Sequence, residues 1–256
     1  MNEIRDGVRE RYTRIASEIA GTNTREGETS CCGEECCGPD VDGCGGGYDA
    51  SELVSLGLDP RASLGCGNPT LMADLRPGDT VLDLGSGAGI DVLLSARRVG
   101  PAGHAFGVDM TDEMLTLARA NQASSGVANA TFLKGTIEEL PLPDQSVDVV
   151  ISNCVINLAA DKRAVLQEAF RVLRPGGRLA VTDMVALLEM PPALKGRMDL
   201  WAGCVAGTIG VDVYAGHLRA TGFEAIDIDV EPNQHPSDFG GWIASAAVRA
   251  TKPPAG

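Results

Sequence analysis

The stretch Thr80–Asp91, which reads TVLDLGSGAGID, decides the fold. Its first five residues are β-branched or apolar around one acid and predict a buried strand. Three glycines follow at alternate positions, and the apolar run after them predicts a helix over 90–98. Because glycine lacks a Cβ atom, the backbone amides of such a loop can approach a ligand at the start of the helix. The stretch therefore predicts a strand, a ligand-binding loop and a helix in succession.

After this loop, short β-rich runs alternate with helical patterns. Strands are expected at 104–109, 131–133, 147–152 and 178–182, and helices at about 112–124 and 161–173. Such alternation is typical of a parallel sheet covered on both faces by helices. The last two runs, 223–230 and 242–250, predict a closing antiparallel pair. We therefore expect an α/β fold with a mostly parallel sheet and a C-terminal antiparallel hairpin.

The N-terminal part differs from this core. Apolar residues recur at helical spacing over 2–20 and predict a short amphipathic helix. Residues 21–49 are rich in Gly, Cys and acids without periodicity, and they predict a mobile loop. The chain thus divides into the helix and Cys-rich loop (1–49), the ligand-binding core (50–185) and a final segment with the hairpin (186–256).

Composition excludes several classes of protein. The formal charge of −14 argues against nucleic-acid binding, which requires clustered Lys and Arg. No apolar run approaches the ~20 residues that span a bilayer, and the N-terminus does not resemble an export signal. Eight cysteines without an export signal favour reduced, working thiols over a secreted disulfide framework. We expect a cytoplasmic enzyme that does not bind membranes.

The ligand of the glycine loop is expected to contain adenosine. Asp109 ends the second predicted strand, where a carboxylate can accept hydrogen bonds from ribose hydroxyls. The spacing G-x-G-x-G differs from the G-x-G-x-x-G of nicotinamide-binding loops, and Asp83 precedes the loop within the strand. The terminal hairpin and the stretches 140–148 and 173–177 resemble class I methyltransferases, whose Rossmann-like fold binds S-adenosyl-L-methionine.

Four strings carry a closer resemblance. They read LGCGNP at 64–69, VDMT at 108–111, SNCVINL at 152–158 and WAGCVAG at 201–207. Together they resemble the arsenite methyltransferases over roughly residues 50–230. The resemblance implies transfer of methyl groups from S-adenosylmethionine to thiol-bound trivalent arsenic, which gives methylated arsenicals and detoxifies arsenic.

The cysteines supply the chemistry that this reaction needs. Trivalent arsenic is soft and selects thiolates over harder ligands. Cys154 follows the fourth predicted strand and Cys204 the fifth, so both are expected at the carboxyl edge of the sheet. The resemblance implies that these two bind arsenic, while Cys66 and an N-terminal cysteine, Cys31 or Cys32, form a second thiol pair for redox turnover. We take Cys32 as the N-terminal partner and count Cys66 among the candidate arsenic ligands.

The resemblance also implies the cofactor contacts and an external partner. Thr136 occupies a position where related methyltransferases often carry an acid near the adenine. The contact with the adenine is therefore assigned to the next two residues, Ile137 and Glu138. The expected cofactor-binding residues are Asp83, Gly85, Ser86, Gly87, Gly89, Asp91, Asp109, Met110, Ile137, Glu138 and Asn153. Thioredoxin or glutathione is the expected reductant.

Two other functions remain open on the sequence. A class I methyltransferase acting on a small organic molecule, such as a quinone precursor, would leave Cys66, Cys154 and Cys204 unexplained as a set. A thiol-rich metalloid- or zinc-binding protein could use the N-terminal cysteines, whose spacing lacks a C-x2-C pair. The intact glycine loop with Asp109 speaks against the second alternative.

Overall fold

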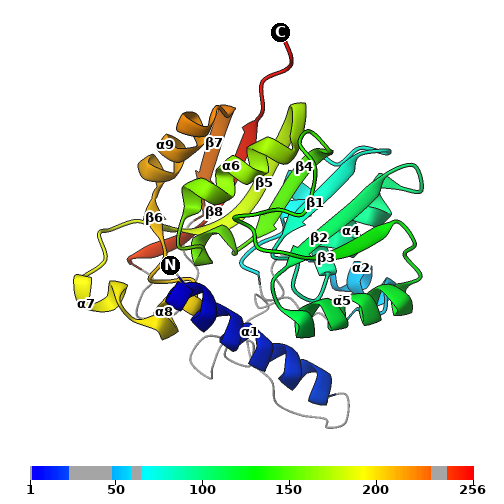
Figure 1. Ribbon diagram of the computed structural model, residues 1–256, viewed down its shortest axis with the longest axis horizontal. Coiled ribbons are helices and arrows are strands. Elements are labelled where there is room, and N and C mark those ends of the chain that lie inside the picture. Colours follow the sequence, from blue (N-terminus) through cyan, green and yellow to red (C-terminus); the bar gives the residue numbers. More distant parts are fainter. Residues whose placement is uncertain (1, 23–47, 59–64, 232–240) are drawn as a thin grey trace.

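The computed structural model describes residues 2–22, 48–58, 65–231 and 241–256. Within them one eight-stranded sheet has the order β3-β2-β1-β4-β5-β8-β7, with β6 paired to β5 (Figure 1). The strands are β1 (Thr80–Leu84), β2 (His104–Asp109), β3 (Ala130–Lys134), β4 (Val147–Asn153), β5 (Leu173–Ala186), β6 (Ile209–Gly210), β7 (Glu224–Val230) and β8 (Ile243–Thr251).

The strand directions confirm the expected fold class. Strands β1 to β5 pair in parallel, while β8 runs antiparallel to both β5 and β7. The fifth strand is longer than the predicted 178–182, because it pairs with β8 along Arg178–Ala186 and meets β4 again at Leu173. The order reverses between β1 and β4, and ligands of open α/β sheets bind at such a switch point.

Helices cover both faces of the sheet. They are α1 (Asn2–Thr22), α2 (Ala50–Ser55), α3 (Pro69–Met72), α4 (Ile90–Val99), α5 (Asp112–Ser125), α6 (Lys162–Val172), α7 (Pro192–Lys195), α8 (Met198–Ala202) and α9 (Val211–Thr221), with a 3-10 turn η2 (Ile156–Leu158). Helix α9 was not expected from the sequence. It buries Tyr214 and Leu218 and ends at Gly222, whose φ of 107° only glycine adopts readily.

Successive side chains of the central strands enter two different cores. Leu82 packs with α6 and α9 on one face, whereas Val81 packs with α2, α4 and α5 on the other. Both are fully buried, as are Val149 and Val150 on the neighbouring strand. Burial on both faces holds the central strands rigidly, so their carboxyl ends form a fixed edge on which a site can be built.

Helix α1 lies outside these two cores and crosses that edge. It packs against α5 and α8, as Figure 1 shows for the blue helix below the sheet, and it buries Val8 and Ala16. The predicted helix over 2–20 is therefore present, two residues longer. The predicted loop at 21–49, with the cysteines from Cys31 to Cys44, lies largely outside the described residues. In the described ranges no helix combines the length and apolarity needed to cross a membrane.

Candidate active site

The glycine loop and the end of β2 form one hydrogen-bonded unit. Gly87 N donates to Asp109 Oδ2 at 2.9 Å, and Thr111 N donates to Asp109 Oδ1 at 2.8 Å. Gly87 has a φ of 50°, and a Cβ atom added there would meet no atom within 4 Å, because it would project into open space. The carboxylate is thus fixed by two backbone donors, and its remaining lone pairs can accept ligand hydroxyls.

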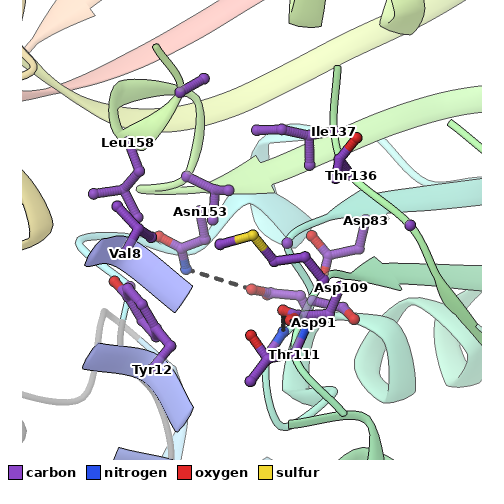
Figure 2. Close-up of a pocket in the computed structure, with 18 of the residues that line it drawn as sticks. Val8, Tyr12, Asp83, Asp91, Asp109, Thr111, Thr136, Ile137, Asn153 and Leu158 are labelled. Carbon is purple, nitrogen blue, oxygen red and sulfur yellow. Dashed lines mark hydrogen bonds between the residues drawn. The ribbon is translucent and has the colours of Figure 1, made fainter. Parts of the chain in front are cut away.

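A cavity lies beside this unit, at the carboxyl ends of β1, β2 and β4 (Figure 2). Of the expected cofactor residues, it is lined by Asp83, Gly85, Ser86, Gly87, Asp91, Asp109, Met110, Ile137, Glu138 and Asn153. Gly89 is not among the residues that line it, and its contact with the cofactor stays a prediction. A Cβ atom at Gly89 would come within 2.6 Å of the Phe132 ring, so this glycine is needed for packing of the loop against β3.

Three carboxyl groups converge on the cavity. Burial and the neighbouring Asp91 and Asp109 hold the pKa of Asp83 well above its usual range. Burial raises the pKa of Asp91 to about 6, against opposing hydrogen bonds from Tyr48 and Asn153, and also raises the pKa of Asp109. Acids held in this way favour a positively charged ligand, which would stabilise their ionised forms. The sulfonium and ammonium groups of S-adenosylmethionine meet that requirement.

Sequence reasoning missed several residues that line the cavity, and four of them precede residue 50. Arg5, Val8 and Tyr12 project from α1, and Figure 2 shows the latter two facing the cavity opposite Asp109. Tyr48 donates from its hydroxyl to Asp91, at 2.7 Å from each carboxylate oxygen. The amphipathic pattern of α1 indicated an apolar face without indicating what that face covers. No motif marks Tyr48.

Asn153 joins this cavity to the cysteines. Its Nδ2 donates to Gly67 O at 2.7 Å and to Tyr48 Oη at 2.9 Å, and reaches Asp91 Oδ2 at 3.4 Å (Figure 2). Its Oδ1 accepts from Cys66 N at 3.0 Å. This one amide therefore connects the end of β4, which Cys154 follows directly, and the segment that carries Cys66 to the wall of the cofactor cavity.

The cysteine pairing differs from the expected one. Cys66 forms a disulfide with Cys154, across 88 residues of sequence, rather than with an N-terminal cysteine. The pairing follows from the fold, because Asn153 holds the Cys66 segment against the end of β4. Cys32 and the other N-terminal cysteines lie outside the described residues, so their part in turnover stays a prediction.

Cys204 lies beside this disulfide with a free thiol. Its Sγ donates to Cys154 O at 3.4 Å, and Asn157 Nδ2 donates to Cys204 O at 2.8 Å. Burial, with a contribution from Asp183, raises the pKa of Cys204 to about 12, so the thiol is protonated in the free protein. Cys154 and Cys204 both have a positive φ, of 59° and 61°, which non-glycine residues adopt at a cost.

The surroundings of the three cysteines are apolar. Cys66, Cys154 and Cys204 belong to one cluster that also contains Met184, Met190, Ile243, Leu200, Trp201 and Trp242. A site that combines thiols with thioether and aromatic neighbours offers few oxygen ligands. It suits a soft, weakly hydrated centre.

The parallel sheet, the glycine loop with Asp109 and the acidic cavity at the switch point define a class I, S-adenosylmethionine-dependent methyltransferase. Residues 75–234 match the family model described as a methyltransferase domain. The chain is 42% identical to the arsenite methyltransferase of Halobacterium salinarum, over 98% of this chain and 67% of that protein. It therefore belongs to the arsenite methyltransferase family.

Two further relatives agree with this assignment. The arsenite methyltransferase of Mus musculus is 42% identical over 50% of this chain, which spans 37% of the mouse protein. Among solved structures, the arsenic (III) S-adenosylmethionine methyltransferase of Chlamydomonas reinhardtii is 32% identical, with a TM-score of 0.68 over 81% of this chain and 75% of that one. The mouse protein is thus considerably longer than this chain.

Proposed function

We propose that this enzyme transfers methyl groups from S-adenosylmethionine to trivalent arsenic held by Cys154 and Cys204, with Cys66 as a further thiol, and so produces methylated arsenicals. The observation that carries the proposal is the meeting of the three cysteines in an apolar cluster at the sheet edge, joined through Asn153 to the cofactor cavity. An organic substrate would require none of these thiols.

The chain's residues divide the work between the two ligands. Bound S-adenosylmethionine supplies an electrophilic methyl group on a cationic sulfur. Asp109, oriented by Gly87 N, holds the ribose, while the acids of the cavity favour the cationic end. Residues 50–185 thus bind the cofactor, together with the α1 side chains, and residues 186–256 contribute Cys204. Proximity of the arsenic to the methyl group is the main catalytic device.

Arsenic binding requires thiols. The Cys66–Cys154 disulfide must first accept two electrons and two protons to become two thiols. Each thiol then exchanges with one hydroxyl of arsenous acid, forming an As–S bond and releasing one water molecule. The proton on Cys204 leaves within that water, so a pKa near 12 does not prevent binding. Until the disulfide opens, Cys204 is the only free thiol in the described part of the chain.

Turnover also requires a reductant. Methyl transfer formally raises arsenic to the pentavalent state, and two thiols that close a disulfide return two electrons to it with loss of two protons. An N-terminal cysteine such as Cys32 would relay these electrons, and thioredoxin or glutathione would reduce the protein again. Such cycling fits the reducing cytoplasm, where we place the reaction.

The direct test is to incubate the purified, reduced protein with arsenite, S-adenosylmethionine and a thiol, and to separate arsenic species by chromatography with mass detection. We expect methylated arsenicals and a matching amount of S-adenosylhomocysteine. Absence of methylated arsenic from a protein that binds the cofactor would refute the proposed substrate.

A second assay tests the division of roles among the thiols. Cys66→Ser should impair methylation of arsenite while partly sparing a substrate that already carries one methyl group, because the latter needs fewer thiol ligands. The two substrates are compared under identical thiol and cofactor concentrations. An equal loss of activity on both substrates would place Cys66 in the arsenic site that both substrates require.

A further inference from the structure

Asp183 is a buried acid that the steps above do not use. The buried acids of the described residues are Asp83, Asp91 and Asp183, and the first two line the cofactor cavity whereas Asp183 does not. It lies on β5 directly after Thr182, whose carbonyl oxygen accepts from Cys154 N at 2.8 Å. Burial of a charged group is costly, so an acid kept at this position calls for a function.

Two backbone amides hold the carboxyl group of Asp183. Met184 N donates to its Oδ1 and Asn157 N to its Oδ2, both at 2.9 Å, so both oxygens act as acceptors, as in an ionised carboxylate. Burial raises its pKa to about 7, although these hydrogen bonds and the charge of Lys162 favour the ionised form. Lys162 acts from a distance, because the described residues include no ion pair between the two and its Nζ donates to Ala159 O at 3.0 Å.

The charge of Asp183 reaches the thiol of Cys204. Asn157 connects the two residues, because its backbone N donates to Asp183 and its Nδ2 donates to Cys204 O at 2.8 Å. After burial, the charge of Asp183 is the largest cause of the raised pKa of Cys204. The other groups that face the carboxyl are Lys162 on α6 and Tyr214 on α9. One negative charge thus lies within electrostatic reach of the sulfur that is expected to hold arsenic.

Methyl transfer moves a positive charge toward this acid. Arsenic that has exchanged its hydroxyls for thiolates is neutral. Its lone pair forms the As–C bond, and both electrons of the S–C bond that breaks stay on the sulfur of the cofactor. This sulfur becomes neutral and the arsenic becomes cationic, with no proton exchanged. Asp83, Asp91 and Asp109 favour the charge on the cofactor side, so an acid on the arsenic side would offset their effect as the charge moves.

We propose that Asp183 is the counter-charge for the arsenic cation that methyl transfer creates, and that it speeds this step without contributing to the binding of neutral arsenic. The inference rests on the proposed function for the reaction and on the fold for the position of the acid. An interaction that strengthens only as the charge develops changes the rate and not the affinity.

The first test separates rate from affinity in single-turnover experiments. Reduced protein loaded with arsenite is mixed with S-adenosylmethionine, and methylated arsenic is measured in quenched samples. Asp183→Asn should lower the rate constant of methyl transfer roughly tenfold, as expected for removal of a unit charge in a protein interior. Arsenite affinity, measured through the fluorescence of Trp201 and Trp242 in the cysteine cluster, should stay near that of the wild type.

Two further variants make this test decisive. Asp212→Asn makes the same change at an exposed acid on α9 and is the matched control, which should keep both values. Asp183→Ser is a second neutral variant, in which water can accept from the two backbone amides. An unchanged rate constant in the neutral variants would overturn the inference. A loss of arsenite affinity equal to the loss of rate would also overturn it, because Asp183 would then only hold the fold around Cys204.

A second readout needs no turnover. In the oxidised protein Cys66 and Cys154 are joined, and alkylation of Cys204 by iodoacetamide is followed by mass spectrometry of its peptide at mildly alkaline pH. Without the charge of Asp183 the thiolate of Cys204 is less disfavoured, so Asp183→Asn should react several-fold faster, whereas Asp212→Asn should match the wild type. Equal alkylation rates would show that the charge does not reach the sulfur and would overturn the inference. Faster alkylation of Asp183→Asn beside a wild type that methylates no arsenical would refute the proposed function, and with it the role in methyl transfer, while the electrostatic link between the two residues stands.

Discussion

The cofactor cavity and the cysteine cluster share one edge of the sheet but differ in chemistry. Asp83, Asp91 and Asp109 line the first, whereas the second combines Cys66, Cys154 and Cys204 with methionine and tryptophan. Buried carboxyl groups whose ionised forms a cation stabilises suit a cationic methyl donor, and apolar surroundings with sulfur ligands suit soft arsenic. The difference shows how one sheet edge can hold two ligands of opposite character.

The two regions also differ in how the chain builds them. The acids and glycines of the cofactor cavity lie mainly on β1, the following loop and the end of β2. The cysteines are separated by 88 residues between the first two and 50 between the last two. Asn153 and the helix α1 each touch both regions. Substitutions should therefore separate cofactor binding from arsenic chemistry.

The largest expected effect is on the cysteine side alone. Cys154→Ser and Cys204→Ser should each abolish methylation of every trivalent arsenical, because a hard, protonated hydroxyl replaces one soft thiolate of the pair. Arsenic held by the other member of the pair with Cys66 would not be aimed at the methyl group. Cofactor affinity, measured by calorimetry, should stay near that of the wild type. Substantial turnover in either folded variant would show that arsenic is held elsewhere.

The converse substitution is Gly87→Val, which should prevent cofactor binding while the cysteines stay reactive toward thiol reagents. The side chain would enter the open cavity and would also strain a residue with a φ of 50°. Gly126→Val provides the control, because its φ of 69° imposes comparable strain at the end of α5 with no atom within 4 Å of the added Cβ. Normal cofactor binding by Gly87→Val would mean that the loop is not the binding element.

Asp109→Ala should have a smaller effect on the same side. Loss of the ribose acceptor is expected to cost about 1 to 3 kcal/mol of binding free energy, as for hydrogen bonds to charged groups. The variant also leaves Gly87 N and Thr111 N without their acceptor, so Asp109→Asn helps to separate the two causes. Calorimetric affinity equal to that of the wild type would remove Asp109 from the cofactor site.

The smallest predicted effect is a pH dependence. Burial raises the pKa of Asp91 to about 6, so the group is ionised above pH 6 and becomes neutral below it. Because the cationic cofactor favours the ionised form, its affinity should fall as pH drops from 7 to 5, by up to about tenfold. The free energy of unfolding of the cofactor-free protein should change in the opposite direction and rise as the pH falls. The reason is that a carboxyl group with a raised pKa is least costly to bury when it is protonated. Asp91→Asn should abolish the dependence of affinity, and a profile that persists in this variant would assign it to another group.

Local patterns predicted most of the sheet. Strand β2 was predicted with its observed ends, because its alternating apolar residues and flanking polar ones form a local signal. The full length of β5 was missed because it depends on pairing with β8, which is far away in sequence. Helix α9 was missed because it depends on the burial of Tyr214 against distant residues. The part that Gly89 plays in packing was missed for the same reason, because the sequence does not show that Phe132 packs against it.

The sequence by itself determined the class of fold, the family and the set of candidate cofactor residues and thiols, because these depend on short motifs whose residues lie close together in the chain. Only the tertiary structure decided that Cys66 pairs with Cys154, that α1 and Tyr48 line the cofactor cavity, and that Asn153 joins the two regions. These contacts form when distant segments meet at the carboxyl edge of the sheet. Their partners are chosen by packing and burial of the whole domain, which no local pattern records.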